Sequence, residues 1–565
     1  MKKIKNILLF FKKIYIVARP YWVSEQKWKG LIFVSSMIVL IFTSNWMLVQ
    51  MNGFQGDWMN NLNSKNRDGF QSALYKYFGI FAIYIPTYIF YIYLKGRFGI
   101  SWRKWYAEKL ISDYFQYKVF YKIHQENIID NPDQRLSEDV RSFVDNTIVL
   151  FMDMLDAIST AISFGVVLWI ISHDLFWVAM GTAFISTIFG ILVFGNMLSD
   201  LNFKQYKLEA DFRFSLMRVR EHAESIAFYN GEFQENIQIV KRLGDVVKNM
   251  VRIILVRTNL FLFSVSTRIL IAAIPTIMIA DKFFNGEVQI GVISQAEGAF
   301  GQLMWALMIV LNSLQQLTNF TADMNRLHEL VESIEAKKKE KNDTNAISIE
   351  ESKNGIFLSF QNLHVSTFDS EKILMQNLNF QISKGDNLLV MGPSGCGKTS
   401  LLRVLARLWN CGSGNIKMPP IKDFFFLPQR PYMIHGSLKA QLLYPGMNAN
   451  ISDDKLQETL KKVRLGDLPS RIGGFDKEID FSHVLSLGEQ QRIAFARLLI
   501  SNQPYAILDE STSALDSENE TNLYSLIKES GIFFISVGHR DSIRKFHDKL
   551  LYIENKDKWE LRDIV

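Results

Sequence analysis

The sequence predicts a polytopic α-helical membrane domain with six spans, followed by a soluble α/β domain. Three observations support this fold class. The first half of the chain contains six long apolar runs, and the second half contains a glycine-rich loop between an apolar strand and a helix. A charged stretch with few aromatic residues separates the two halves. We therefore expect a membrane domain over residues 1–325, a linker over 326–355 and a soluble domain over 356–565.

Each predicted span has about 20 residues, the length that crosses the hydrocarbon core of a bilayer. The run 31–42 has no polar face, which argues against the buried helices of a soluble protein. Trp28, Trp46, Trp169 and Trp177 lie near span ends, where interfacial aromatic residues gather. The approximate limits are 30–50, 74–94, 147–171, 175–198, 259–280 and 290–311.

Charge predicts the orientation in the membrane. The loops after the second and fourth spans are rich in Lys and Arg, whereas Ser172-His173-Asp174 is only a minimal turn. Both termini are therefore expected in the cytoplasm. The amphipathic run 7–17 is expected to lie on the cytoplasmic surface of the membrane. The net charge of +6 is concentrated near the N-terminus, so it indicates topology rather than nucleic-acid binding. The two cysteines, Cys396 and Cys411, fit a reducing compartment.

Four charged residues fall within the predicted spans: Arg268, Glu297, Asp153 and Asp156. A charge at membrane depth costs several kcal/mol unless it is paired or hydrated. Two interpretations stay open. The residues line a water-filled path, or they form structural pairs such as Arg268 with Glu297.

The glycine-rich loop has the spacing of a phosphate-binding loop. It follows an apolar strand, 387–391, and opens a helix, 400–408, as this motif requires. Backbone N–H groups and the helix dipole would hold phosphates, Lys398 would reach the β- and γ-phosphates, and Thr399 would bind Mg²⁺. The candidate nucleotide-binding residues are Gly392, Pro393, Ser394, Gly395, Cys396, Gly397, Lys398, Thr399 and Ser400.

Four further motifs follow in the same domain. Gln429 lies in Leu427-Pro428-Gln429-Arg430, and Asp509 and Glu510 end the apolar strand that starts at Tyr505. The stretch Leu485-Ser486-Leu487-Gly488-Glu489-Gln490-Gln491-Arg492 precedes that strand, and His539 follows the apolar strand 532–537. With these motifs in this order, the domain resembles the ATPases of ABC transporters.

The resemblance implies a role for each motif. Glu510 would polarise the attacking water, His539 would lie near the γ-phosphate, and Asp509, with Thr399 and Gln429, would hold Mg²⁺. Ser486, Gly488 and Glu489 would bind the nucleotide of an opposing subunit, which implies a homodimer using ATP and Mg²⁺. Leu487 and Glu489 depart from the commonest signature. The adenine-stacking residue is not obvious, and Phe368 is the candidate.

The membrane half carries a second resemblance. The segments 130–139 and 209–227 resemble the family that unites peroxisomal fatty-acyl transporters with SbmA/BacA-like peptide and cobalamin uptake proteins. This resemblance implies an exporter-type half-transporter in a bacterial inner membrane, in contact with membrane lipid and working by ATP hydrolysis. Uptake of hydrophilic peptide or cobalamin-like cargo is the favoured function. Movement of acyl-CoA or lipid, and an ATP-gated channel or sensor, are the alternatives.

Overall fold

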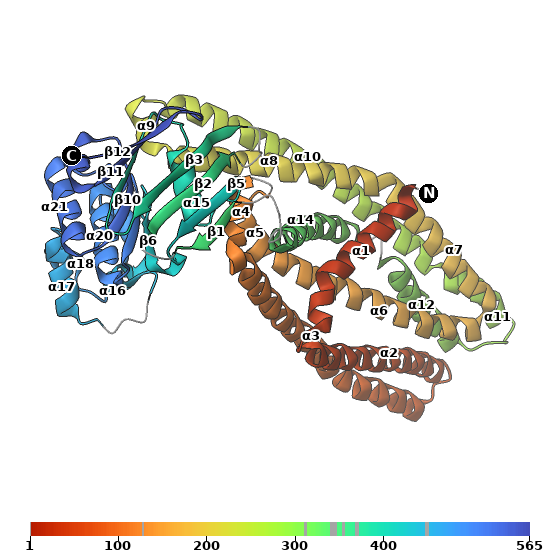
Figure 1. Cartoon of the computed structure of the whole chain (residues 1–565). Coiled ribbons are helices and arrows are strands. Elements are labelled where there is room, and N and C mark those ends of the chain that lie inside the picture. Colours follow the sequence, from red (N-terminus) through yellow and green to blue (C-terminus); the bar gives the residue numbers. More distant parts are fainter. Residues whose placement is uncertain are drawn as a thin grey trace. The chain divides into compact units, whose positions relative to one another are not determined.

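The computed structural model describes residues 2–126, 129–309, 313–339, 347–352, 356–367, 372–446 and 451–564. The chain forms two compact units, Met1–Lys338 and Lys339–Val565. The first unit is helical, and the second combines sheets and helices (Figure 1).

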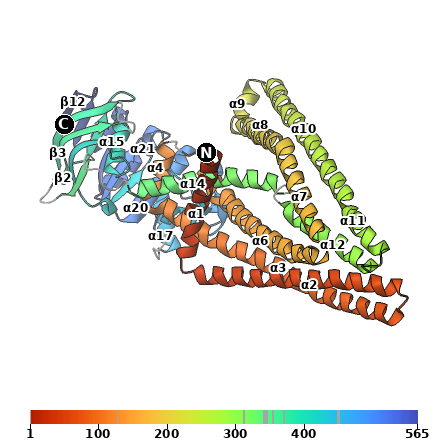
Figure 2. The ribbon, with the colours of Figure 1, turned by 90° about the vertical axis from the view of Figure 1, so that its right-hand side faces the viewer.

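The helical unit is built from long helices that pack in pairs. Helices α2 and α3 lie side by side, and α8 pairs with α10 (Figure 2). Helix α6 contacts α2, α3 and α12. The helices are α1 (Lys2–Val23), α2 (Lys27–Asn63), α3 (Arg67–Phe115), α4 (Val119–Glu126), α5 (Pro132–Gln134), α6 (Val140–Ile171), α7 (His173–Gly190), α8 (Asn196–Glu221), α9 (Ala223–Phe228), α10 (Glu232–Ala272), α11 (Ile274–Phe284), α12 (Ile290–Leu307) and α14 (Leu314–Lys339).

Five helical stretches in the described part of the chain have the length and composition to cross a membrane. The first four contain the first four predicted spans, and the fifth contains only part of the predicted span 259–280. The prediction of six spans is therefore not confirmed. The five stretches are Lys27–Asn63, Arg67–Glu126, Pro132–Ile171, His173–Glu221 and Glu232–Thr267.

The two remaining predicted spans differ from the structure for separate reasons. The span 259–280 is interrupted, because α10 ends at Ala272 and α11 begins at Ile274 with Pro275 in its first turn. Proline lacks a backbone N–H and is accommodated at the start of a helix rather than inside one. The predicted span 290–311 begins with α12, but this helix ends at Leu307 and is not among the five stretches with the length and composition to cross a membrane. Residues 310 and 311 lie outside the described part of the chain.

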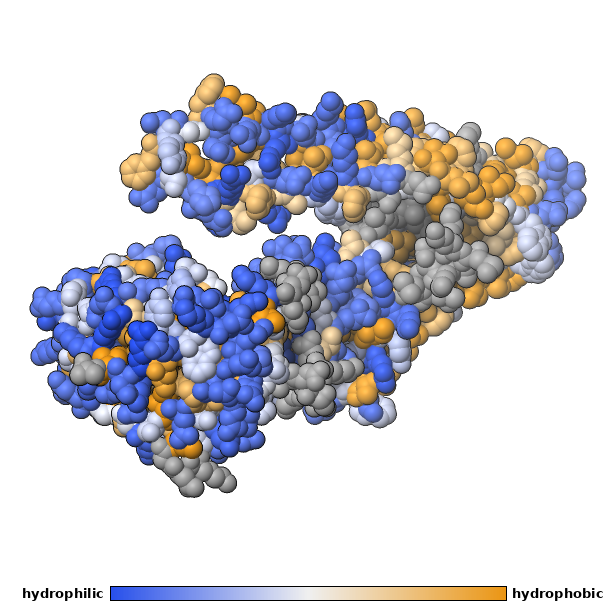
Figure 3. All heavy atoms as spheres, turned by 45° about the horizontal axis from the view of Figure 1, so that its top comes forward, coloured by the Kyte–Doolittle hydropathy of each residue, from blue (hydrophilic) through white to orange (hydrophobic). Residues whose placement is uncertain are grey.

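The surface of the helical unit agrees with a membrane environment. Mostly apolar side chains cover the region of α7 and α11, whereas hydrophilic and apolar side chains are mixed on the arm formed by α8 and α10 (Figure 3). Phe184 and Ile185 of α7 and Ile277 of α11 are 67%, 68% and 70% exposed. Surfaces of this kind are stable in contact with lipid rather than water.

The second unit is organised around a six-stranded sheet of order β12-β11-β4-β10-β9-β6. All neighbours pair in parallel except β11 and β12, so the loops after β4, β6, β9 and β10 leave the same edge. Ligands bind at such an edge in open α/β sheets. The strands are β4 (Leu388–Met391), β6 (Phe424–Leu427), β9 (Tyr505–Asp509), β10 (Phe533–Val537), β11 (Lys549–Ile553) and β12 (Trp559–Asp563).

Two smaller sheets and several helices complete this unit. The four-stranded sheet has the order β1-β5-β2-β3, and β7 pairs with β8. Their strands are β1 (Ser348–Glu351), β2 (Ile356–Ser366), β3 (Ile373–Ser383), β5 (Gly412–Met418), β7 (His435–Ser437) and β8 (Glu478–Asp480). The helices are α15 (Lys398–Leu405), α16 (Leu438–Leu443), α17 (Asp453–Lys462), α18 (Leu468–Ile472), α19 (Phe481–Val484), α20 (Leu487–Ser501) and α21 (Ser517–Glu529).

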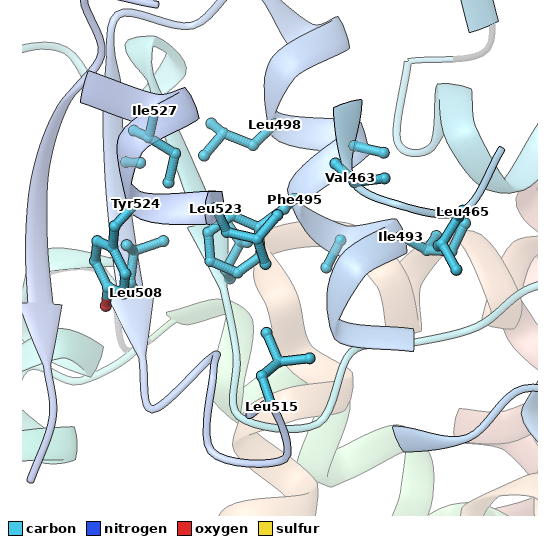
Figure 4. Packing of buried hydrophobic residues seen from close by; sticks show 14 of the residues in the cluster. Val463, Leu465, Ile493, Phe495, Leu498, Leu508, Leu515, Leu523, Tyr524 and Ile527 are labelled. Carbon is cyan, nitrogen blue, oxygen red and sulfur yellow. The ribbon is translucent and has the colours of Figure 1, made fainter. Parts of the chain in front are cut away.

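Two hydrophobic cores cover the two faces of the six-stranded sheet. Successive residues of a strand point to opposite faces, so Leu388 joins one core and Leu389 the other. In the core that contains Leu389, Phe495 and Leu498 of α20 pack near Leu508 of β9 (Figure 4). This packing fixes α20 against the strand that ends at Asp509.

Candidate functional site

The loop between β4 and α15 has a backbone that requires glycine. Gly392 has φ +153° and Gly397 has φ +99°, values that L side chains rarely adopt. A Cβ on Gly392 would lie 2.2 Å from the carbonyl oxygen of Ile553. A Cβ on Gly397 would lie 3.1 Å from Cε of Met375. The glycines therefore allow the loop to pack closely against β11 and β3.

Lys398 opens α15 with its side chain folded into this loop. Its Nζ donates to the carbonyl oxygens of Gly392 and Pro393, each at 2.9 Å, and the residue is only 6% exposed. A buried ammonium group held at the start of a helix suits the binding of an anion. The remaining loop residues predicted to bind nucleotide, Ser394, Gly395 and Cys396, lie in the same turn, and Ser400 lies in the first turn of α15.

Glu510 is the meeting point of three loops. Its carboxylate accepts a hydrogen bond from Nε2 of Gln429 at 2.9 Å, and its other oxygen lies 3.1 Å from Nε2 of His539. Its backbone has φ +45° and donates to the carbonyl oxygen of Val537 at 3.1 Å. A non-glycine residue in this conformation is strained by about 1–2 kcal/mol. The carboxylate lies between both partners, so the three predicted catalytic residues are together.

Asp509 and Thr399 lie beside this group. Thr399 Oγ1 donates to Oδ1 of Asp509 at 3.4 Å. Burial, and then the charge of Glu510, raise the pKa of Asp509, while Thr399 and the cations Arg403 and Lys398 oppose the rise. A hydroxyl and a carboxylate oxygen at this separation fit Mg²⁺, which prefers oxygen ligands. Two of the three residues predicted to bind the metal, Thr399 and Asp509, are therefore in contact, and the third, Gln429, contacts Glu510, the residue that follows Asp509.

The signature residues form a second group at the start of α20. Ser486 is the N-cap: its Oγ accepts from the backbone N–H of Glu489 at 3.3 Å, and the carboxylate of Glu489 accepts from the backbone N–H of Ser486 at 2.9 Å. This reciprocal arrangement is a capping box. A Cβ on Gly488 would lie 3.2 Å from the carbonyl oxygen of Ala514, so glycine brings α20 close to the loop after β9.

Gln491, which was not predicted as a site residue, connects α20 to two loops. Its side-chain amide donates to the carbonyl oxygen of Gln429 at 3.1 Å and to Oγ of Ser513 at 3.2 Å. Its oxygen accepts from the backbone N–H of Ala514 at 3.1 Å, and the residue is fully buried. Its place as a polar residue within the stretch 485–492 was the available signal. Its partners depend on the tertiary structure.

Arg540 was also missed. Its guanidinium donates to the carbonyl oxygens of Leu515 at 2.8 Å and Ser513 at 3.1 Å. It lies next to His539, so the loop after β10 is connected to the loop after β9 at two adjacent positions. A small pocket between these loops is lined by Glu510, Thr512, Ser513, Glu520, Val537, Gly538, His539, Arg540 and Ile543.

Within the helical unit, three of the four predicted span charges have described partners. Lys95 Nζ lies 2.7 Å from Asp153, and Asn45 donates to Asp156 at 3.1 Å. Glu297 accepts a hydrogen bond from Thr276. The side chain of Arg268 lies outside what the structure describes, as does Phe368, so the Arg268–Glu297 pair and the adenine contact stay predictions.

The segment 130–139 forms an ion network with α14. Arg135 lies 2.6 Å from Asp130 and 3.0 Å from Glu329. Arg326 donates to both oxygens of Asp139 at 2.8 Å. Arg135 and Asp139 are 5% and 2% exposed, so this network fixes the start of α6 to α14.

The fold and site define a P-loop ATPase joined to a helical membrane domain. The family model described as ABC transporter transmembrane region 2 matches residues 18–284, and the one described as ABC transporter matches residues 375–513. An uncharacterized ABC transporter ATP-binding protein of Synechocystis sp. is 40% identical over 550 residues, covering 96% of this chain and 83% of the relative. The chain therefore belongs to the ABC transporters, with the membrane region and the ATPase fused in one polypeptide.

Two other relatives are similar over nearly their whole length. ABC transporter D family member 2, chloroplastic, of Arabidopsis thaliana is 36% identical, covering 100% of this chain and 89% of the relative. The human lysosomal cobalamin transporter ABCD4 is 28% identical, covering 98% and 96%. The solved structure of a bacterial Atm1-family ABC exporter with ATP bound has a TM-score of 0.78 at 17% identity, covering 94% of this chain and 95% of that one. The predicted exporter-type fold is confirmed.

The family also settles the biochemical class. The chain is a multi-pass membrane protein that binds ATP, and its ATP hydrolysis is coupled to transport. This confirms the ATPase predicted from the sequence.

Proposed function

We propose that this half-transporter works as a homodimer that takes up a hydrophilic, peptide or cobalamin-like solute across a bacterial inner membrane, with both termini in the cytoplasm. The observation that carries the ATP-driven part of the proposal is the position of Glu510 between Gln429 and His539. This arrangement supplies a base beside the phosphate loop, which a binding module without turnover does not need.

Each polar residue of this site has a distinct role in the proposed mechanism. Lys398 and the loop N–H groups bind the β- and γ-phosphates of ATP. Glu510 accepts a proton from, or orients, the attacking water, and Gln429 and His539 hold its two carboxylate oxygens. Thr399, Asp509 and Gln429 would hold Mg²⁺, which when bound offsets the charge of the phosphate oxygens.

The proposed dimer follows from the division of the ATPase residues into two groups. The phosphate loop lies after β4, whereas Ser486, Gly488 and Glu489 lie at the start of α20. In ABC ATPases the signature binds the nucleotide of the opposing subunit, so two chains head to tail would complete two sites. Lipid is the other expected contact, because apolar side chains cover the region of α7 and α11.

Two features support a hydrophilic cargo. The name of the human relative specifies cobalamin, a large polar solute. In addition, Asp153, within the predicted span 147–171, keeps 39% of its side chain exposed although it pairs with Lys95. A partly exposed charge at membrane depth favours a hydrated path over a lipid-filled one.

The test is ATP-dependent flux in liposomes with a matched panel of peptide, cobalamin, acyl-CoA and lipid. Movement of peptide or cobalamin in wild type, and its loss in Lys398→Ala, is the expected result. Movement of acyl-CoA or lipid alone would replace the proposal with the lipid alternative. An ATP-gated ion current with no cargo accumulation would identify a channel.

A mixing experiment tests the dimer. Lys398→Ala chains combined with Ser486→Ala chains form heterodimers with one intact composite site and one doubly damaged site. Such heterodimers should hydrolyse ATP faster than either mutant homodimer. Full activity in a verified monomer would contradict the proposed assembly.

A further inference from the structure

The signature of this chain carries a carboxylate where an anion is expected to bind. Glu489 stands in the first turn of α20, and its Oε2 accepts hydrogen bonds from both the backbone N–H and the hydroxyl of Ser486, at 2.9 and 3.1 Å. An uncompensated negative charge beside Ser486 would repel the phosphate of a nucleotide.

An arginine faces the other oxygen of this carboxylate. Nη1 of Arg471, in the last turn of α18, lies 2.7 Å from Oε1 of Glu489. The side chain of Glu489 is 14% exposed and that of Arg471 is 43% exposed, so the carboxylate is shielded from water whereas the guanidinium is partly hydrated. Burial raises the pKa of Glu489, but Arg471 and Ser486 outweigh it, and the pKa lies below its ordinary value. Glu489 is therefore a charged partner of Arg471 at neutral pH.

We propose that Arg471 is a positioning residue for the ATP site: it neutralises Glu489 and holds that carboxylate on Ser486, so that the signature can receive a phosphate. The functional unit of the signature thus includes Arg471, which lies on α18 and precedes the signature in the sequence. This inference rests on the proposed homodimer, because the phosphate in question is that of the partner subunit.

The local geometry supports a positioning role over a general contribution to stability. Arg471 also lies 3.5 Å from Asp467, one turn earlier on the exposed side of α18. That second contact is longer, and the side chain of Asp467 is 64% exposed. Loss of Arg471 would therefore leave Asp467 hydrated, whereas Glu489 would keep its charge beside Ser486 without the cation that now contacts it.

The test is a double-mutant cycle in the full-length protein, with ATP hydrolysis as the assay. Arg471→Met should raise the KM for ATP by about fivefold to tenfold, the effect of losing one partly shielded charge-assisted hydrogen bond, with a smaller change in kcat. Glu489→Gln should restore most of the affinity in Arg471→Met, because the amide brings no charge. Lys462→Met removes a charge from the exposed Glu458 pair of the same unit and should leave KM unchanged.

The outcomes separate the inference from the proposed function. An unchanged KM in Arg471→Met would overturn the inference, and so would an equal effect of Arg471→Met with and without the Glu489→Gln change. If Arg471→Met does not fold, Arg471→Gln gives the same comparison with an amide that can still donate. ATP-dependent dimerisation of Glu510→Gln chains is measured in parallel. Absence of dimerisation would contradict the homodimer. Normal dimerisation together with additive effects of Arg471→Met and Glu489→Gln on KM would contradict only the role proposed for Arg471.

Discussion

The side-chain nitrogen of Gln491 lies 3.1 Å from the backbone carbonyl oxygen of Gln429. The helix α20 is therefore hydrogen-bonded to Gln429, whose side-chain amide contacts Glu510. Through Ser513 and Ala514 the same side chain also holds the loop after β9. One fully buried amide thus fixes the relative positions of α20 and two site loops.

Gln491→Met should lower kcat by about tenfold or more, because it removes three hydrogen bonds while keeping the shape of the side chain. Gln490→Met is the matched control. Gln490 bonds to the carbonyl oxygens of Ser482 and Leu485, next to its own helix, and its loss should change kcat little. Steady-state ATPase assays with melting temperatures compare the two, and equal losses would argue against this role of Gln491.

Glu510→Gln should bind ATP but hydrolyse it about 10²–10⁴-fold more slowly, because an amide cannot accept a proton from water. Glu518→Gln is the control, since Glu518 forms an exposed pair with Arg464. Nucleotide binding and single-turnover hydrolysis are measured on the same preparations. Near-normal turnover in Glu510→Gln would remove this carboxylate from the mechanism.

Arg326→Met should destabilise the helical unit by about 3–5 kcal/mol, because it leaves the carboxylate of Asp139, only 2% exposed, without its bidentate partner. The double mutant with Asp139→Asn should recover part of this loss, since the buried charge is then gone. Thermal unfolding in detergent measures both. Lys104→Met, which removes an exposed pair with Glu108, is the control.

His547 predicts a loss of ATPase-domain stability in mild acid. Burial lowers the pKa of His547 from 6.5 to about 4, so the unfolded chain binds a proton between these values and the folded chain does not. Its contribution is fully present above pH 6.5 and falls as the pH is lowered towards 4, by at most about 3 kcal/mol. His547→Phe should flatten this dependence, because phenylalanine has no titratable group and its ring can pack against Phe534 and Tyr524. An unchanged pH profile of thermal unfolding would assign the acid sensitivity elsewhere.

The sequence predicts which residues meet at the site better than it predicts the hydrogen bonds between them. Gln429, Glu510 and His539 meet because each follows a parallel strand, and the ends of parallel strands share one edge. Gln491 and Arg540 could not be assigned, since most of their partners are backbone groups of loops whose course only the packed structure fixes.

The helical unit shows the same limit in another form. The sequence placed Asp153 within a span, but its partner Lys95 depends on how α3 and α6 are rotated against each other. Pro275 indicates the helix break before Ile274. The prediction of one continuous span missed this break, because hydropathy does not register a missing N–H donor.

The ion network of Asp139, Arg135 and α14 has a mechanical consequence. Helix α14 is the last helix of the unit before the chain continues into the ATPase. Asp139 and Arg326 clamp it to the start of α6, and Arg135 adds a second clamp one helical turn away. A displacement of α14 at this end would therefore act on the start of α6 through these ion pairs. We expect the two helix ends to move together.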